Sequence, residues 1–262
     1  TLNGAIGYPV GPLDRGLANM VGIVLTYSRL TVGLSGAASM MRAWREAARY
    51  CQFREAFDLP IAQFPMAAGQ LAKIERGAKR TLAGAFRLYR AVLALPGGLA
   101  PNSGPEESDD LKKKRFEVRE LIMLQKIATS LDAPEVLRLA MSLFGGHGVM
   151  EDFSALPRLY RDAAVNELWE GPRNVLLAQI HRDLLNASAW YGPEHFVANI
   201  LAGAPSDVIE ALQQEIMDIF AHPNLFEMSS IALLTCERWD SFCHRLYHAY
   251  QDVAMALVET PG

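Results

Sequence analysis

The chain has 262 residues, half of them hydrophobic and 21% charged, with a net charge of −4 at neutral pH. This size and composition allow a large core, organised as one domain or one and a half, and the negative charge gives no reason to expect a nucleic acid partner. Three cysteines, Cys51, Cys236 and Cys243, lack the spacing of a disulfide framework, so we expect free thiols and a cytoplasmic, reducing location. We also expect no secretory signal, and no apolar run approaching the length of a membrane span.

The first residues are loop-like, with Asn3-Gly4 and Gly7-Tyr8-Pro9, and no convincing β alternation follows the first ten. Because the chain starts at Thr1 in such sequence, we expect it to be a piece of a longer polypeptide.

Helical periodicity dominates the sequence after these residues. We expect a first long helix from Gly16 to Phe53, whose many small residues suit close contact between helices. A second helix is predicted by apolar positions in alternating three- and four-residue steps. These positions are Leu71, Ile74, Ala78, Leu82, Ala85, Tyr89 and Val92. A third helix follows the same pattern from Leu121 to Leu131, and Pro134 marks its boundary.

A linker separates the second and third helices. It runs from Pro96 to Pro105 and is extended by the acidic residues 106–110. The basic run Lys112-Lys113-Lys114-Arg115 follows directly. It is a weak signal for an interaction patch, and we interpret it as the solvated start of the third helix.

The composition changes after Asn186. From there on, ten acidic side chains stand against two arginines, a net charge of −8, and breaks occur at 191–193 and 203–206. The last helical pattern runs from Ala232 to Ala256. The sequence therefore predicts an all-α fold, with an antiparallel four-helix-bundle-like domain over 16–186 and a separate acidic helical appendage over 187–262.

The most informative motifs lie between residues 144 and 171. Phe144-Gly145-Gly146-His147-Gly148 precedes Pro157-Arg158-Leu159-Tyr160-Arg161-Asp162, and Trp169-Glu170-Gly171 follows. Glu170 is a candidate general base, because Trp169 and Leu168 would partly desolvate its carboxylate. Gly171 would let a flat ring or a thioester approach the backbone. Alternatively, Glu170 caps the helix that starts near Pro172, and both roles can hold at once.

This order of motifs resembles the C-terminal half of the acyl-CoA dehydrogenase family, flavoenzymes that desaturate acyl thioesters. The resemblance covers roughly Asn3 to Leu185. It implies FAD as cofactor, an acyl-CoA thioester as substrate, electron-transfer flavoprotein as acceptor, and self-association to a dimer or tetramer. It also implies that residues 1–15 are a remnant of the exit from the family's middle β-domain, on the evidence of Gly11-Pro12-Leu13-Asp14-Arg15.

The resemblance assigns the catalytic and substrate-binding residues. Glu170 aligns with the base of most family members. A minority place their glutamate immediately before the arginine of the first helix, where this chain has Ser28. Arg29 matches that arginine, and the resemblance implies that Arg29 and Gly171 contact the substrate.

Further residues are assigned to the cofactor. Arg54 and Phe57 match the family's Arg-x-x-Phe-Gly-x-Pro-Ile element, whose arginine reaches the pyrophosphate of a flavin held mainly by the neighbouring subunit. Gly145 and Gly146 match the glycine pair where the backbone approaches the adenine side of that dinucleotide. The alternatives are a surface charge at a helix end for Arg54 and a plain helix-ending turn for the glycines.

Four positions depart from the family pattern. Asp58 replaces a glycine, Ser142 a flavin-contacting glutamine, and Asn174 a second glutamine. Pro172 replaces the threonine that bonds the flavin, and it has neither a hydroxyl nor an N–H to donate. These changes affect the expected FAD contacts and leave the expected fold intact.

Two functions therefore remain open. In the first, Glu170 removes the α-proton of an acyl-CoA while a hydride passes from the β-carbon to FAD, giving a 2-enoyl-CoA; this segment alone would be inactive. In the second, the chain is a non-enzymatic helical assembly or regulatory module with impaired flavin binding. A DNA-associated flavoprotein, as in the branch of the alkylation-response flavoprotein that these motifs most resemble, is disfavoured by the acidic tail.

A histidine pair near the end raises the question of a metal. His244 and His248 lie one helical turn apart, next to Cys243. No third ligand is evident at a suitable spacing, so we expect no metal site.

Overall fold

The computed structural model describes residues 3–99, 107–222 and 224–259, and this part of the chain is almost entirely helical. The α-helices are α1 (Gly16–Asn19), α2 (Leu25–Phe53), α3 (Pro65–Leu93), α4 (Asp109–Leu143), α5 (Leu156–Val165), α6 (Arg173–Ala187), α7 (Pro193–Ile200), α8 (Ser206–Phe220) and α9 (Ser230–Glu259). Shorter helical turns are η1 (Leu13–Arg15), η2 (Met20–Val24), η3 (Ile61–Gln63) and η4 (Gly145–Val149), and the two strands are β1 (Glu55–Ala56) and β2 (Leu59–Pro60).

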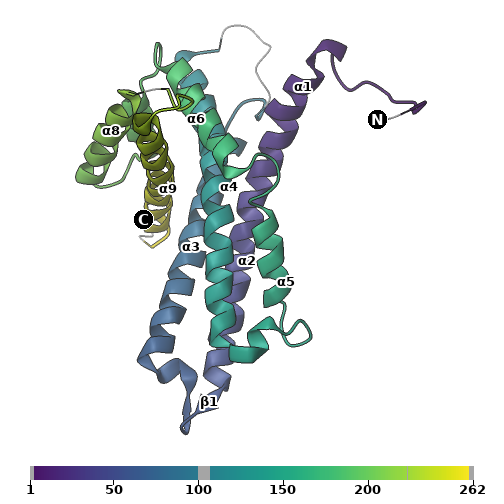
Figure 1. Cartoon of the computed structure of the whole chain (residues 1–262), viewed down its shortest axis with the longest axis vertical. Coiled ribbons are helices and arrows are strands. Elements are labelled where there is room, and N and C mark those ends of the chain that lie inside the picture. The colour runs from purple at the N-terminus through teal and green to yellow at the C-terminus, as the bar shows by residue number, and fades with distance from the viewer. Residues whose placement is uncertain (1–2, 100–106, 223, 260–262) are drawn as a thin grey trace.

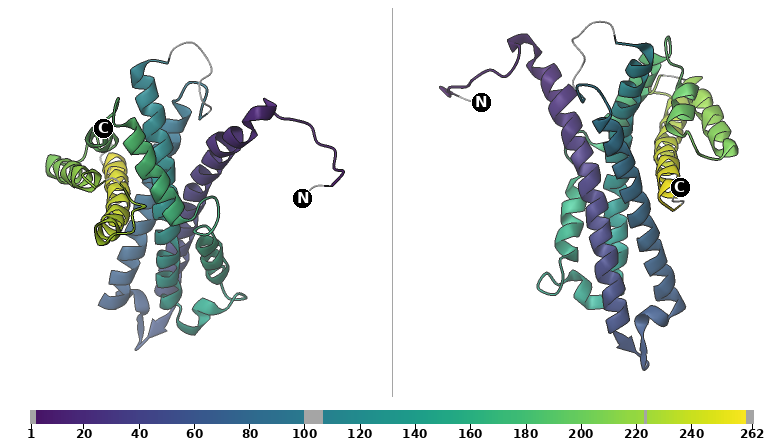
Figure 2. Two further views of the ribbon diagram at one scale, coloured as in Figure 1. Left: turned by 45° about the horizontal axis from the view of Figure 1, so that its top comes forward. Right: turned by 180° about the vertical axis from the view of Figure 1, so that it is seen from behind.

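The helices form the expected antiparallel bundle. α2 runs down the molecule, α3 returns beside it, and α4 descends between them and a fourth column in which α5 and α6 follow one another upward (Figure 1). α2 packs against both α3 and α4. The N-terminal residues extend away from the bundle on the side opposite α8 (Figure 2). The all-α prediction is confirmed.

Small residues on α2 allow α4 to approach closely, as their abundance in the sequence suggests. A Cβ atom on Gly33 would lie 1.9 Å from the side-chain nitrogen of Gln125, and one on Gly36 would lie 2.4 Å from Cγ2 of Thr129. The space that these two glycines leave is therefore filled by polar side chains of α4.

The prediction that the third helix ends near Pro134 is wrong. α4 continues through Pro134 to Leu143. A proline inside a helix removes a backbone hydrogen bond and costs about 3 kcal/mol. Here Ala133, Leu137 and Ala140 are buried around it in the core, and this packing holds the backbone helical on both sides of the proline.

The tip of the bundle carries a short β-hairpin that the sequence pattern did not predict. β1 and β2 form a hairpin with Glu55 opposite Pro60. Its two turn residues, Phe57 and Asp58, have φ angles of +52° and +64°. A two-residue hairpin turn of type I′ requires positive φ at both of these positions. Asp58 therefore takes a backbone conformation that favours the glycine usual in the family.

The segment before α4 is only partly described, and residues 100–106 of the predicted linker lie outside the described residues. Ser108 caps α4 by accepting a hydrogen bond from the Leu111 N–H at 3.4 Å. The Lys112 ammonium lies 4.1 Å from the ring centroid of Trp190. The basic run is thus the start of the helix, as predicted, and its Lys112 makes a cation–π contact with Trp190.

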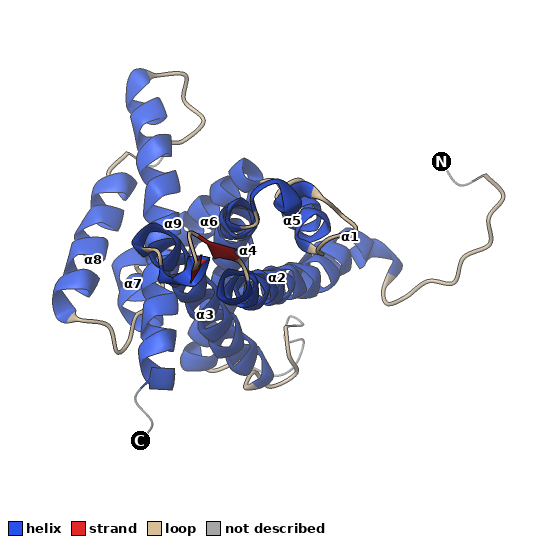
Figure 3. Ribbon diagram, turned by 90° about the horizontal axis from the view of Figure 1, so that it is seen from below, coloured by secondary structure: helices blue, strands red, loops and turns tan. Residues whose placement is uncertain are grey.

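The last three helices share a hydrophobic core with the bundle, so the tail is not a separate body. One continuous buried cluster includes Leu88 of α3, Leu124 of α4 and Trp239 of α9. The Tyr247 hydroxyl donates to Oε1 of Gln125 at 3.0 Å, and the Gln125 amide donates to the Leu30 carbonyl at 3.2 Å. α9 lies across the bundle axis, as the view along that axis shows (Figure 3).

One helical run in the described chain, Leu13–Phe53, is long and apolar enough to cross a membrane by length and composition. The expectation that no apolar run approaches that length is therefore wrong. A single such helix is weak evidence for a span, because a core helix of a soluble bundle meets the same test. Here Leu30, Val32 and Met40 are buried against the bundle, whereas Leu13 and Leu17 are 87% and 77% exposed.

Candidate active site

The Trp169-Glu170-Gly171 segment forms a tight loop between α5 and α6. Glu170 and Gly171 both have left-handed backbone conformations, with φ angles of +58° and +98°. A glutamate rarely adopts such a conformation, and holding it there requires support from the surrounding structure.

Two buried cations of the bundle supply this support through the loop carbonyls. Nε of Arg29 on α2 donates to the Glu170 carbonyl at 2.9 Å. Nζ of Lys126 on α4 donates to the Gly171 carbonyl at 2.9 Å and to the Glu167 carbonyl at 3.4 Å. Arg29 and Lys126 are 5% and 1% exposed, so the loop is fixed from the interior of the bundle.

The Glu170 carboxylate points toward the same interior. The Ser28 hydroxyl of α2 donates a short hydrogen bond to Oε1. Oε2 is buried and, among the described residues, has no hydrogen-bond partner. The neighbouring indole of Trp169 is 50% exposed and donates to the Asn166 side chain at 3.1 Å.

The electrostatic surroundings of the loop are unusual for a bundle interior. Burial and, to a smaller extent, the positive charge of Arg29 lower the pKa of Lys126, Glu170 and Glu167 oppose the shift, and the resulting pKa is about 8. Burial also lowers the pKa of Arg29, with Glu170 as the main opposing influence. Two desolvated cations thus flank one carboxylate, an arrangement typical of functional sites.

The N-terminus of α6 follows the loop and carries two of the four departures from the family, Pro172 and Asn174. Pro172 precedes the helix, and the exposed Asn174 accepts a hydrogen bond from the Val175 N–H at 3.0 Å. Between them, Nε of Arg173 donates to Asp240 of α9 at 2.8 Å. The tail is therefore tied directly to the segment that follows the candidate base.

The residues predicted to bind the adenine and pyrophosphate of FAD lie at the opposite end of the bundle. Arg54 ends α2 and is exposed, next to Phe57 at 91% exposure. The exposed Gly145 and Gly146 follow α4, and a Cβ atom on either would meet open space. The ring of Tyr50 on α2 stacks on Phe144 at 4.2 Å, so the two predicted elements lie at one tip. The Ser142 hydroxyl donates to the Leu139 carbonyl at 2.7 Å.

The structure thus divides the predicted site residues into two groups. Ser28, Arg29, Glu170 and Gly171 meet near the first residues of α2. Arg54 caps the far end of α2, about 38 Å from Arg29 along a helix that rises 1.5 Å per residue. One dinucleotide cannot reach from one group to the other.

Sequence comparison identifies the family. Residues 14–185 match the family described as "Acyl-CoA dehydrogenase, C-terminal domain". The chain belongs to the acyl-CoA dehydrogenase family.

Curated relatives agree with this family assignment. The chain is 28% identical over 181 residues to acyl-CoA dehydrogenase family member 11 of Caenorhabditis elegans, covering 69% of this chain and 27% of that protein. It is 28% identical over 185 residues to the putative acyl-CoA dehydrogenase AidB of Escherichia coli, covering 71% and 31%. It is 32% identical over 179 residues to 3-methylmercaptopropionyl-CoA dehydrogenase of Ruegeria pomeroyi, covering 64% and 28%. The chain therefore spans less than a third of the length of these relatives.

Solved structures show the same fold. The apo-form of Bd2924 matches with a TM-score of 0.74 at 21% identity, covering 95% of this chain and 44% of that one. Caenorhabditis elegans ACDH-11 in complex with C11-CoA matches with a TM-score of 0.67 at 21% identity, covering 96% of this chain and 45% of that one. A Bacillus anthracis acyl-CoA dehydrogenase complexed with FAD gives 0.59 at 16%, covering 96% and 51%.

Some contacts in this family member were not foreseen from its sequence. The hydrogen bond from Ser28 to Glu170 joins residues 142 positions apart. The sequence could have revealed Lys126 as a buried polar residue, because it interrupts the apolar pattern of α4 at a position that the helix period places in the core. No feature of the sequence predicted the Arg173–Asp240 pair, because neither residue stands out from the surface charges around it.

The prediction that His244 and His248 lack a third ligand is wrong. Asp132 of α4 lies between them, with Oδ1 3.0 Å from Nε2 of His244 and Oδ2 2.7 Å from Nε2 of His248. Burial raises the pKa of Asp132, but the hydrogen bonds to both histidines outweigh it and hold that pKa well below its usual range.

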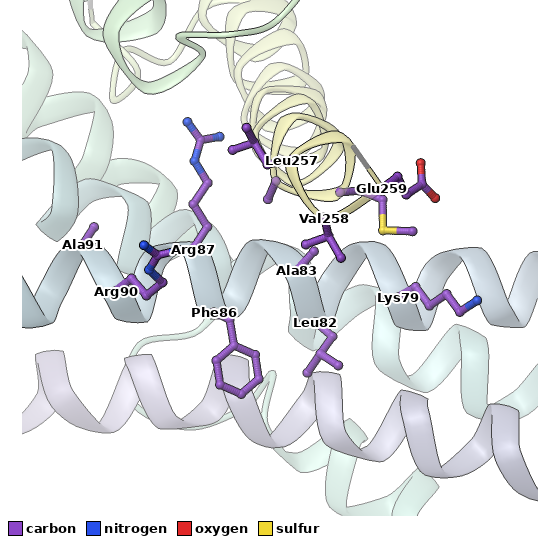
Figure 4. A pocket seen from close by; sticks show the side chains of 12 residues that line it. Lys79, Leu82, Ala83, Phe86, Arg87, Arg90, Ala91, Leu257, Val258 and Glu259 are labelled. Atoms are coloured by element: carbon purple, nitrogen blue, oxygen red, sulfur yellow. The ribbon is translucent and has the colours of Figure 1, made fainter. Parts of the chain in front are cut away.

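The cavity beside the end of α9 does not coincide with the Glu170 loop. A cavity of about 780 Å³ lies between α3 and the end of α9, lined by Phe86, Arg87 and Val258 among others (Figure 4). None of the predicted site residues lines it. A smaller cavity of about 220 Å³ is lined by Thr26, Arg29, Arg119 and Gln179, on the α2 side of the candidate base.

Proposed function

We propose that this chain is the C-terminal part of a flavin-dependent acyl-CoA dehydrogenase, in which Glu170 removes the α-proton of an acyl-CoA thioester and a 2-enoyl-CoA is formed. The observation that carries the proposal is the carboxylate itself. Its Oε1 is fixed by Ser28, while Oε2 is buried without a partner among the described residues. An unpaired, buried carboxylate oxygen is available to accept a proton.

The surrounding residues have distinct parts in this chemistry. Arg29 and Lys126 hold the loop backbone through three carbonyl contacts, which fixes the direction of the carboxylate. FAD, when bound, takes up the hydride that leaves the β-carbon, and electron-transfer flavoprotein is the proposed acceptor of the electrons.

The residues at the far tip fit a dinucleotide. The exposed Arg54 can pair with a pyrophosphate, and the open space beside Gly145 and Gly146 permits close approach to the backbone. At the other end, Pro172 has no donor for the flavin. The residues of this chain therefore fit the phosphates of FAD well and its flavin ring less well.

The separation of the two groups supports self-association. Because one FAD cannot span α2, the group around Arg54 serves a flavin whose ring lies against a different protomer. We propose a dimer or tetramer in which each chain contributes its base to one site and Arg54 to another.

The test is an anaerobic titration of the full-length polypeptide that contains this chain with a panel of acyl-CoA thioesters. The visible absorption of oxidised flavin should bleach with one substrate class. The Glu170→Gln variant should bleach at least about a hundredfold more slowly, because the base is lost. Glu135→Gln, on the exposed surface of α4, is the matched control and should react like the unmodified protein.

Two results would contradict the proposal: a full-length protein without flavin, or a flavin that no thioester reduces in the unmodified protein. Either would favour the second candidate, a helical assembly or regulatory module. Pro172 and the Ser142 hydroxyl, which is occupied by the Leu139 carbonyl, are the observations that favour this candidate.

A further inference from the structure

Outside the candidate active site, Asp132, His244 and His248 form a compact group of metal-ligand side chains. Asp132 projects from the middle of α4, and the two histidines project from successive turns of α9. One ligand atom from each residue can be chosen so that all three lie within 4.8 Å of one another. The two imidazole centroids are 4.1 Å apart.

The donor set is one that transition metals prefer. Two histidines at positions i and i+4 of a helix present their nitrogens on one face, the spacing used in helical zinc sites. Two imidazole nitrogens and a carboxylate oxygen are ligands for Zn²⁺, and imidazole also suits the neighbouring divalent metals. Ca²⁺ and Mg²⁺ prefer oxygen ligands and are a poor match.

The dimensions are close to those of a tetrahedral site. Ligands about 2.0 Å from a zinc ion are about 3.3 Å from each other in a tetrahedron. The carboxylate oxygens lie 3.0 and 2.7 Å from the two imidazole nitrogens, so small side-chain rotations open the space for an ion. The backbone positions are already fixed, because both helices belong to the shared core.

The exposure of the group leaves room for a further ligand. The side chains of Asp132, His244 and His248 are 17%, 30% and 23% exposed. A site buried on the protein side and open on the other can complete its coordination with water, as zinc sites with three protein ligands do.

We propose that Asp132, His244 and His248 bind one divalent transition metal ion, with Zn²⁺ as the best match, which fastens α9 to α4. This inference is independent of the proposed dehydrogenase activity, because none of the three residues contacts the Glu170 loop. The competing explanation is a metal-free clamp in which both imidazoles donate N–H groups to the carboxylate.

The experiment uses the whole chain, freed of metal with a chelator and titrated with Zn²⁺ by calorimetry. We expect one Zn²⁺ per chain and a rise in melting temperature on Zn²⁺ addition. Asp132→Asn and His248→Gln should each weaken binding more than about tenfold and abolish the rise. Glutamine keeps an N–H near the position of Nε2, so His248→Gln preserves the clamp while it removes a metal ligand. His195→Gln, at a side chain 70% exposed on α7, is the matched control and should bind like the unmodified chain.

Co²⁺ provides a second readout that does not depend on the stability of the variants. In the unmodified chain, Co²⁺ should produce visible ligand-field bands of tetrahedral intensity that Zn²⁺ displaces. The proposal is overturned if the unmodified chain binds less than one Zn²⁺ at saturation, or if His248→Gln binds as tightly as the unmodified chain. The group is then a hydrogen-bonded clamp only.

Discussion

Glu170 and Gly171 are consecutive residues that both have left-handed backbone conformations, with φ angles of +58° and +98°. For a residue with a Cβ atom this costs about 1 to 2 kcal/mol. Three hydrogen bonds from Arg29 and Lys126 to the loop carbonyls offset the cost. Local strain of this kind is typical of functional positions, and here it turns the glutamate into the bundle.

Replacing Gly171 with alanine should distort this loop. The new Cβ atom would lie 2.8 Å from Cδ2 of the buried Leu176, in a backbone conformation that alanine disfavours. We expect a loss of about 1 to 3 kcal/mol in the free energy of unfolding, measured by denaturant titration.

A glycine on α3 provides the comparison for that variant. Gly69 has no positive φ, and a Cβ atom there would meet nothing within 4 Å. Gly69→Ala should therefore stabilise the protein by about 0.5 to 1 kcal/mol. If Gly171→Ala proved as harmless as Gly69→Ala, the loop would not be held as the structure shows.

At the scale of elements, the contact between α6 and α9 contains a buried histidine. His181 is 4% exposed and contacts the rings of Phe220 and Trp239, with centroid distances of 4.7 and 5.3 Å. Its Nε2 has no hydrogen-bond partner among the described residues. Burial lowers its pKa to about 4, so the contact requires the neutral imidazole.

This histidine makes the stability of the protein depend on pH. Because its pKa is lower in the folded state than the unfolded value of about 6.5, the unfolded state binds more protons between these values. The free energy of unfolding should therefore fall as the pH drops from about 6.5 to about 4, by at most about 3 kcal/mol from this residue. In His181→Leu this contribution to the pH dependence of the free energy of unfolding should disappear. Urea unfolding at a series of pH values measures it.

The exposed His222 on the loop after α8 serves as the reference for that measurement. His222→Leu should leave the pH dependence of the unmodified protein in place. A His181→Leu variant with the same slope as the His222→Leu variant would show that His181 does not couple protonation to the packing of α9.

At the scale of the whole molecule, the tail completes the core that the bundle begins. Ile180 of α6, Phe196 of α7 and Trp239 of α9 belong to one buried cluster with residues of α3 and α4. The family match ends at residue 185, yet the solved neighbours cover 95% and 96% of the chain. The fold therefore continues through the tail where the sequence similarity has faded.

Removing residues 187–262 should expose this cluster. We expect the shortened chain to lose its cooperative thermal transition and to aggregate, as followed by circular dichroism and size-exclusion chromatography, because buried apolar surface would be returned to water. Removing residues 1–12 is the control, since Ile6, Tyr8 and Val10 are each 92% exposed. A shortened chain that kept the oligomeric state of the unmodified chain and melted cooperatively would restore the interpretation of residues 187–262 as a separate appendage.

The sequence by itself determined the all-α class of the fold and identified the candidate base. The helical period marks apolar positions every three or four residues, a local property that needs no knowledge of the fold. It predicted the helical run from Gly16 to Phe53 and the helix around Ala232 to Ala256, both of which the structure contains. The order of motifs around Glu170 predicted the family, and the comparison confirms it. The roles of the individual site residues stay predictions.

Only the tertiary structure decided the contacts between residues distant in sequence. It placed Ser28 against Glu170, brought Asp132 between His244 and His248, kept α4 helical through Pro134, and packed α9 onto the bundle. Each outcome depends on which surfaces meet when the helices pack. A period of 3.6 residues says which face of a helix is buried, but not which partner covers it.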